Sequence, residues 1–232
     1  MAGLELATLA LVGSGEYLPP MESVDRALIS RLAAPARIVC LPTAAGSMGA
    51  QRLAYWKQLG VEHFTRIGVA VESLLVFDRR SADDPAWAER IAAANFVYLS
   101  GGRPDHLYKT LAGSRAWQAI EGVLTQGGVL AGCSAGAMVQ GEKFFGFSGW
   151  RTGFGLLPGV TIIPHYDELS ERLIQVARAL LAAGLTVVGI DGNTALVKSG
   201  ERHEVLGSGH VTIWNRAGRT RYPAGPLPDG LL

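Results

Sequence analysis

The sequence has few cysteines, no excess of charge of either sign and no long apolar run. Its only cysteines, Cys40 and Cys133, lie in apolar runs without C-x-x-C spacing, which indicates neither a disulfide framework nor a zinc site and fits a reducing compartment. Twenty-one Lys and Arg residues stand against 20 Asp and Glu residues, a formal net charge of +1. This balance gives no general attraction to nucleic acid or to an anionic membrane.

No segment approaches the roughly 20 apolar residues that a membrane-spanning helix needs. The N-terminal segment lacks a basic region, and glycines and Glu16 interrupt its short apolar run, so we interpret it as a first strand rather than a targeting signal. We therefore expect a cytoplasmic protein that acts on a small peptide, with no nucleic-acid or membrane partner. A homodimer is left open.

Short apolar runs alternate with amphipathic stretches, and hydrophobic residues make up 48% of the 232 residues. A chain of this length and composition fits one α/β domain over residues 1–232. The apolar runs are typical of parallel strands buried on both faces: Leu6–Val12, Ile38–Leu41, Phe96–Leu99, Val129–Ala131 and Thr186–Ile190. Between them we predict helices at about residues 21–33, 47–59, 83–94, 114–126 and 167–184.

The predicted fold class is thus α/β, a doubly wound, mostly parallel sheet flanked by helices. Three shorter apolar runs follow near the C-terminus, separated by turn signals: Thr194–Val197, Glu204–Leu206 and His210–Trp214. They predict a small β-meander or hairpin at one edge of the sheet.

A G-x-S-x-G pattern, Gly132 to Gly136, follows the run Val129–Ala131. Between a buried strand and a helix this pattern is typical of a nucleophile elbow, a strained turn that presents a serine hydroxyl above the sheet. Ser134 is the predicted nucleophile, and the N–H of Ala135 a predicted oxyanion donor. The alternatives are a serine that merely caps the helix and a nucleophilic Cys133, which we expect instead to pack beneath the turn.

A glycine pair, Gly101 and Gly102, directly follows another buried strand, at the carboxyl edge where open α/β sheets bind ligands. One of their N–H groups is expected to complete the oxyanion hole with Ala135, where each donor contributes about 2.7 to 4 kcal/mol. Arg103 comes next, and its planar guanidinium suits a substrate carboxylate, as does that of Arg151. A simple turn and solvent-exposed arginines are the alternatives.

His165 follows an apolar run and a proline, so it is expected to emerge at a strand end as the base that accepts the serine proton. The remaining histidines are expected in ordinary surface, edge or half-buried positions: His63, His106, His203 and His210.

A carboxylate should orient the imidazole, and Asp191, after the run Thr186–Ile190, is the first choice. Asp167 and Glu168 are alternatives, although both are expected to begin a helix, and Glu142 is a more distant one. Glu16, after the first strand, is predicted to bind a substrate amine or, equally, to brace the neighbouring loops.

Several segments, in this order, resemble those of peptidase family S51, the family of aspartyl dipeptidase (peptidase E) and cyanophycinase. They are GSGE, LPTA, SGGRPDHL, GCSAGAM, GFGLLPGV followed by PHYDE, and GIDGNTALV. Members of that family look like class I glutamine amidotransferase domains that carry serine in place of cysteine. The resemblance implies a metal-free and cofactor-free acyl transfer through a covalent intermediate, with Ser134 as nucleophile and His165 as base.

The sequence departs from this pattern in one place. The resembled proteins commonly read GIDE, or have glutamate before Gly-Asn, whereas Asp191 is followed here by Gly192. Either Asp191 substitutes for the glutamate or the triad is altered. The segment GGRPDHL is closer to the dipeptidases than to the GGDQ of cyanophycinases, which favours a short Asp-containing peptide as substrate. Two alternatives stay open, a catalytically impaired binding or regulatory protein and a cysteine-dependent enzyme that uses Cys133.

Overall fold

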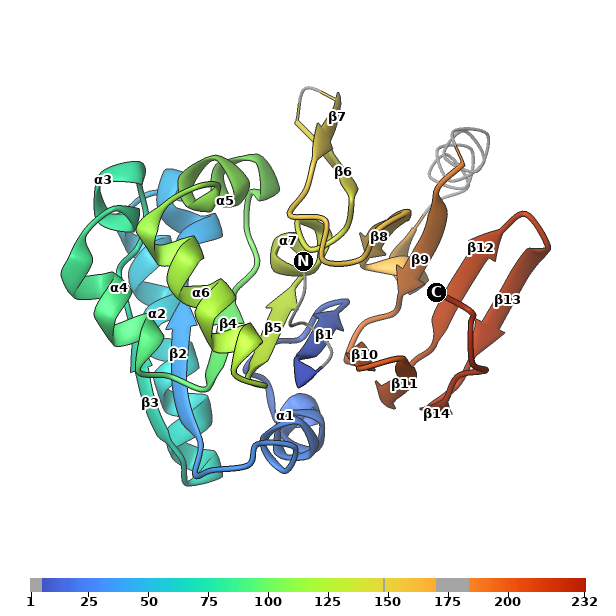
Figure 1. Cartoon of the computed structure of the whole chain (residues 1–232), viewed down its shortest axis with the longest axis horizontal. Helices are drawn as coiled ribbons and strands as arrows, with labels where there is room; N and C mark the ends of the chain where they lie inside the picture. The colour runs from blue at the N-terminus through green and yellow to red at the C-terminus, as the bar shows by residue number, and fades with distance from the viewer. Residues whose placement is uncertain (1–5, 148, 170–183) are drawn as a thin grey trace.

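The computed structural model describes residues 6–147, 149–169 and 184–232. Within them, eight strands form the main sheet in the order β14-β11-β10-β1-β5-β4-β2-β3 (Figure 1). Its parallel part comprises β1 (Thr8–Val12), β5 (Val129–Cys133), β4 (Phe96–Leu99), β2 (Arg37–Leu41) and β3 (Ala70–Ser73). Three antiparallel strands extend it beside β1: β10 (Thr194–Ser199), β11 (Arg202–Gly207) and β14 (Gly225–Pro226).

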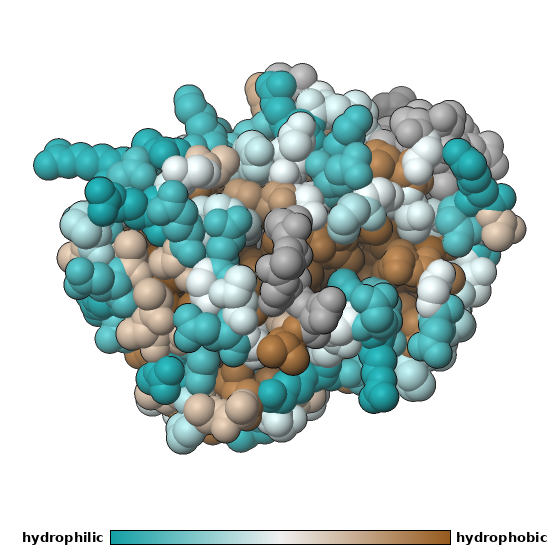
Figure 2. Space-filling model, viewed as in Figure 1, coloured by the Kyte–Doolittle hydropathy of each residue, from teal (hydrophilic) through white to brown (hydrophobic). Residues whose placement is uncertain are grey.

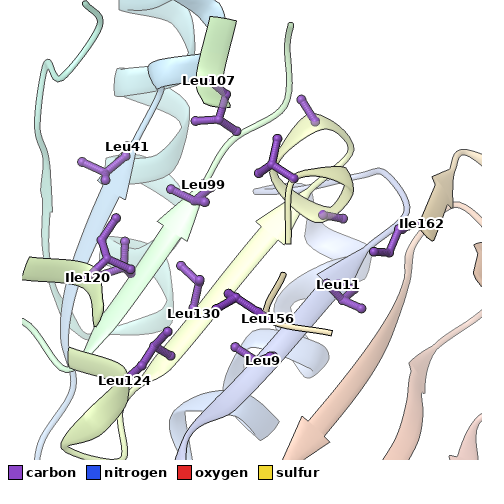
Figure 3. Packing of buried hydrophobic residues seen from close by; sticks show 14 of the residues in the cluster. Leu9, Leu11, Leu41, Leu99, Leu107, Ile120, Leu124, Leu130, Leu156 and Ile162 are labelled. Atoms are coloured by element: carbon purple, nitrogen blue, oxygen red, sulfur yellow. The ribbon is translucent and has the colours of Figure 1, made fainter. Parts of the chain in front are cut away.

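Helices cover both faces of the parallel part, as the uninterrupted apolar strands require. In β1, Leu9 and Leu11 belong to one buried cluster and Ala10 and Val12 to the other, because successive side chains of a strand point to opposite faces. The first cluster packs against α4 (Pro85–Ala92), α5 (Pro104–Leu111) and α6 (Arg115–Thr125), and the second against α1 (Glu22–Ile29) and α2 (Ala50–Ile67). Figure 3 shows Ile120 and Leu124 of α6 beside Leu99 and Leu130 of the sheet. Two further helices are short, α3 (Arg79–Ala82) and α7 (Ala135–Met138).

A second, four-stranded sheet in the order β13-β12-β9-β8 lies beside the first. It comprises β8 (Val160–Pro164), β9 (Thr186–Ile190), β12 (Val211–Asn215) and β13 (Gly218–Tyr222). A separate hairpin, β6 (Lys143–Gly146) and β7 (Gly149–Thr152), projects above α7 between α5 and β8 (Figure 1). In the described part of the chain, no helix combines the length and the apolar character needed to cross a membrane.

The predicted fold class is confirmed, and two strand placements need correction. The run Thr186–Ile190 is a buried strand, but it belongs to the second sheet, parallel to β8, rather than to the main sheet. The predicted C-terminal meander divides between the sheets, because β10 and β11 form the edge next to β1 whereas β12 pairs with β9. An apolar run shows that a strand is buried but carries no information about its partner.

Four of the predicted helices correspond to α1, α2, α4 and α6, with shifted ends. Helix α2 continues to Ile67 and ends where Gly68 adopts a left-handed conformation, with φ of +88°. The fifth, predicted at residues 167–184, falls mainly outside the described residues, and its start forms a short 3₁₀ turn, Tyr166–Glu168.

The end of β5 tolerates no side chain at Gly132. A Cβ there would lie 2.3 Å from the Gly136 carbonyl oxygen, because the chain turns back on itself between strand and helix. We predict that Gly132→Ala lowers the free energy of unfolding by about 2 to 3 kcal/mol, measured by urea denaturation.

Gly122→Ala is the matched control. A Cβ at Gly122, inside α6, meets no atom within 4 Å, so this substitution should raise the free energy of unfolding by up to about 1 kcal/mol. Equal effects of the two substitutions would contradict the close approach at Gly132.

Candidate active site

Ser134 occupies a strained turn between β5 and α7. Its φ of +51° and ψ of −108° are unusual for a residue with a side chain and cost about 1 to 3 kcal/mol. The turn is fixed on both sides, since the Ser134 N–H donates to Val12 of β1 and its carbonyl accepts from Ala137 and Met138. The Ser134 side chain makes no helix-capping hydrogen bond, which argues against the interpretation of this serine as a cap.

His165 supplies the imidazole beside this hydroxyl. It directly follows Pro164, the last residue of β8, and its Nε2 lies 2.9 Å from Ser134 Oγ. The backbone of His165 has a φ of +127°, a conformation that L-residues rarely adopt. Two strained residues on different sheets therefore place a hydroxyl and an imidazole at hydrogen-bond distance, the arrangement that activates a serine nucleophile.

The structure does not bring the Asp191 carboxylate together with His165. Its carboxylate is buried, and Oδ2 accepts hydrogen bonds from the Arg221 guanidinium at 2.9 Å and from the His210 N–H at 3.0 Å. Because β9 lies in the second sheet, the residue after it faces β12 and β13. Among the described residues, the carboxylate paired with His165 is that of Glu168, whose Oε2 lies 3.9 Å from Nδ1, beyond hydrogen-bond distance.

Asp167 occupies the neighbourhood of Gly192. Its Oδ1 accepts the Gly192 N–H at 2.9 Å. A Cβ at residue 192 would lie 3.5 Å from Asp167 Oδ2 and 3.1 Å from Ser14 Oγ. The carboxylate of Asp167 thus lies against the position where the S51 pattern commonly has glutamate.

The glycine pair after β4 is adjacent to the serine, as predicted, but only one of its N–H groups is available. A Cβ at Gly101 would lie 3.4 Å from the Ser134 Cβ, which shows how close the two loops are. The Gly101 N–H donates to Glu16 Oε1 at 2.9 Å and is therefore occupied. The N–H groups of Gly102 and Ala135 have no hydrogen-bond partner in the described part of the chain, so these two are free for an oxyanion.

Glu16 is buried and braces the loops rather than facing a ligand. While Oε1 accepts from Gly101, Oε2 accepts the thiol proton of Cys133 at 2.8 Å. Burial, and secondarily the negative charge of Glu16, raises the pKa of Cys133 well above its usual value. This thiol is protonated and enclosed, which argues against Cys133 as the nucleophile.

Both predicted arginines lie outside the serine–histidine pair. Arg103 is exposed and borders a cavity of about 520 Å³ that Gly102 and His106 also line. Arg151, on β7, pairs through Nε with Asp105 Oδ1 at 3.4 Å. His106 lies within hydrogen-bond distance of the Phe77 carbonyl, so its ring is engaged in a loop contact.

A second cavity, of about 310 Å³, opens directly on Ser134 and His165. Its remaining lining residues are almost all apolar: Met138, Phe145, Trp150, Thr161, Ile162, Ile163, Pro164 and Leu169. The sequence analysis did not identify these apolar residues as part of the site. The signal was the aromatic cluster around a turn in KFFGFSGW, which is the β6–β7 hairpin.

The chain is similar to known proteins in sequence and in fold. The model of peptidase family S51 matches residues 9–206. Cyanophycinases from Synechococcus elongatus and Thermosynechococcus vestitus are each 32% identical over 165 residues, which are 65% of this chain and 51% of the relative. The chain thus spans about half the length of these curated relatives.

Two solved structures are also similar. A peptidase from an acI-B1 Actinobacterium is 35% identical, with a TM-score of 0.86 over 94% of this chain and 95% of its own. A putative peptidase E protein from Listeria monocytogenes EGD-e has a TM-score of 0.67 over 87% and 98% of the two chains. At 16% identity it shows the fold alone.

The enclosed thiols yield a prediction about alkylation. Burial also raises the pKa of Cys40, to about 12, so at pH 8 neither Cys40 nor Cys133 carries an appreciable thiolate fraction. Iodoacetamide should leave the native protein unmodified in intact-mass measurements and add two labels after denaturation. Rapid alkylation of Cys133 in the native protein would contradict its role beneath the turn.

Proposed function

The chain belongs to peptidase family S51, and from this premise we propose that it is a serine-type peptidase that hydrolyses short, Asp-containing peptides. The observation that carries the proposal is the 2.9 Å separation of Ser134 Oγ and His165 Nε2 at a strained strand-to-helix turn. The buried, protonated Cys133 leaves the serine as the nucleophile at this turn.

The proposed reaction is acyl transfer in two steps. Ser134 Oγ attacks the scissile carbonyl carbon and gives its proton to His165 Nε2, while the N–H groups of Gly102 and Ala135 stabilise the oxyanion. The C–N bond then breaks, and His165 gives the proton to the leaving amine. In the second step a water molecule, deprotonated by His165, attacks the acyl carbon. The ester bond to Ser134 Oγ then breaks, the acid leaves, and His165 returns its proton to Ser134 Oγ.

Orientation of the imidazole is assigned to Glu168, whose carboxylate is 3.9 Å from His165 Nδ1. A bound substrate that excludes water would strengthen this electrostatic interaction. Because the Glu168 side chain is 67% exposed, its contribution should be smaller than that of a buried triad carboxylate.

Arg103 is the proposed ligand of the substrate carboxylate. It lies next to Gly102 and lines the same cavity, and its side chain has no hydrogen-bond or ion-pair partner among the described residues. A planar guanidinium binds a carboxylate through two parallel hydrogen bonds. Arg151 is the weaker candidate, because it already pairs with Asp105.

A second candidate function is a binding or regulatory protein without turnover. Two observations favour it. Asp191, at the position expected for the triad acid, is committed to Arg221 and His210, and residue 192 is glycine. Such a protein would bind Asp-containing peptides through the same cavity but release them intact.

A fluorophosphonate probe tests the nucleophile. Wild-type protein and Cys133→Ala should both be labelled, whereas Ser134→Ala should not, because Ser134 is the serine that has an imidazole within hydrogen-bond distance in the described part of the chain. Labelling is measured by intact mass after each variant is shown to be folded by circular dichroism. A folded wild type that takes no label would contradict the hydrolase, and labelling of Ser134→Ala would place the nucleophile elsewhere.

A pair of carboxylate variants tests the orientation of His165. Glu168→Gln should lower kcat at least about tenfold, but by less than the roughly 10⁴-fold cost of losing a buried triad aspartate. Asp191→Asn should leave kcat nearly unchanged and lower the free energy of unfolding by about 1.5 to 3 kcal/mol, because it weakens charged hydrogen bonds. Peptide turnover and urea denaturation are the measurements, and the opposite assignment of effects would restore Asp191 as the acid.

A further inference from the structure

None of the reaction steps proposed for Ser134 and His165 uses the hydrophobic cavity that opens on them. We infer that it is the subsite for the residue on the leaving-amine side of the scissile bond and that it accepts a large apolar side chain. This inference rests on the proposed peptidase function and adds to it the identity of the second residue.

The lining of the cavity defines the chemistry of its occupant. Of the lining residues, only His165 has an ionisable side chain, so a charged substrate side chain would lose hydration without gaining a partner. A volume of about 310 Å³ suffices for a leucine- or phenylalanine-sized group. Figure 2 shows that hydrophilic side chains cover most of the outer rim of one face, while hydrophobic ones show through nearer its middle.

The β6–β7 hairpin forms the aromatic wall of the cavity, Phe145 and Trp150. It does so because successive side chains of a strand point to opposite faces. Phe144 points into the core and is fully buried, whereas the next residue, Phe145, faces Trp150 as its cross-strand partner. The two rings meet edge to face, with centroids 5.3 Å apart. Yet Phe145 is 50% exposed and Trp150 39% exposed. Large aromatic side chains left this exposed beside a reactive pair are expected where a ligand covers them.

Stereochemistry decides which half of a peptide this cavity receives. The carbonyl oxygen must point to the Gly102 and Ala135 N–H groups, and the leaving nitrogen must lie near His165 Nε2, which protonates it. Gly102 and Arg103 line the larger cavity, whereas His165 lines the apolar one, and the two cavities share only Met138 and Phe145. A peptide across Ser134 therefore places its acyl residue toward Arg103 and its leaving residue in the apolar cavity.

The test compares dipeptides that differ only in the leaving residue. With Asp-Leu, Asp-Gly and Asp-Lys, kcat/KM follows from the amino acid released, measured by mass spectrometry. Wild-type enzyme should prefer Asp-Leu over both others at least about tenfold, since even a single methylene group in a hydrophobic pocket changes kcat/KM by about 10- to 200-fold.

Three variants test whether the apolar cavity causes the preference for Asp-Leu. Trp150→Ala should lower kcat/KM for Asp-Leu about tenfold and change that for Asp-Gly less than twofold. Trp150→Glu should raise the ratio of Asp-Lys to Asp-Leu turnover. A general folding defect would lower both rates and could not produce this change in preference. Tyr55→Ala is the matched control, because Tyr55 is 49% exposed and lines neither cavity, and it should leave all three rates unchanged.

Failure of this inference is distinguishable from failure of the proposed function. Equal turnover of the three dipeptides, or equal losses for all of them in Trp150→Ala, would overturn the subsite while leaving the peptidase intact. No turnover of any dipeptide together with no fluorophosphonate label would overturn the proposed function itself. Arg103→Ala should weaken all three Asp dipeptides by the same factor, which separates the acyl side from the leaving side.

Discussion

The carboxylate of Glu16 holds together the three strand ends from which half of the site is built. It follows β1, accepts the N–H of Gly101 after β4, and accepts the thiol proton of Cys133, the last residue of β5. A buried carboxylate without partners is strongly unfavourable, so both contacts must form when the sheet folds. They fix the glycine loop against the serine turn and leave the N–H groups of Gly102 and Ala135 without a hydrogen-bond partner among the described residues.

The other half of the site depends on how the second sheet is attached. His165 directly follows β8, and the adjacent strand β9 runs directly into the turn at residues 191–193 that leads to β10 in the main sheet. Glu142, which follows α7, donates its N–H to Val160 and accepts the N–H of Gly159. These contacts hold β8 beside the helix that follows Ser134. The serine and the imidazole thus come from different sheets. The turn at residues 191–193 joins the second sheet to the main sheet, and the contacts of Glu142 hold β8 beside α7. Together they determine the distance between Ser134 and His165.

Much of this arrangement could be predicted from the sequence. Ser134 and His165 were identifiable because each follows an apolar run. The shared edge of one parallel sheet does not explain why they meet, because β5 and β8 lie in different sheets. The position of Asp191 after a strand was also predicted correctly. Its partners were not, because a run of buried residues does not reveal that β9 belongs to a second sheet whose neighbours include Arg221.

Other features required three-dimensional contacts. The sequence allowed Glu16 to brace the neighbouring loops but did not indicate that its partner is the Gly101 N–H, so the two glycines were equivalent candidates for the oxyanion hole. The aromatic wall was missed because its strands are short and separate from both sheets, although alternation in KFFGFSGW places Phe144 inside and Phe145 outside.

In the proposed reaction Ser134, activated by His165, forms a covalent acyl-enzyme. The most direct measurement is rapid mixing with an aspartyl p-nitrophenyl ester, followed by acid quench and mass mapping of the protein. We expect a burst of about one p-nitrophenolate per chain and an aspartyl adduct on Ser134, both absent in Ser134→Ala. An adduct on Cys133, or turnover without any burst or adduct, would contradict the proposed reaction.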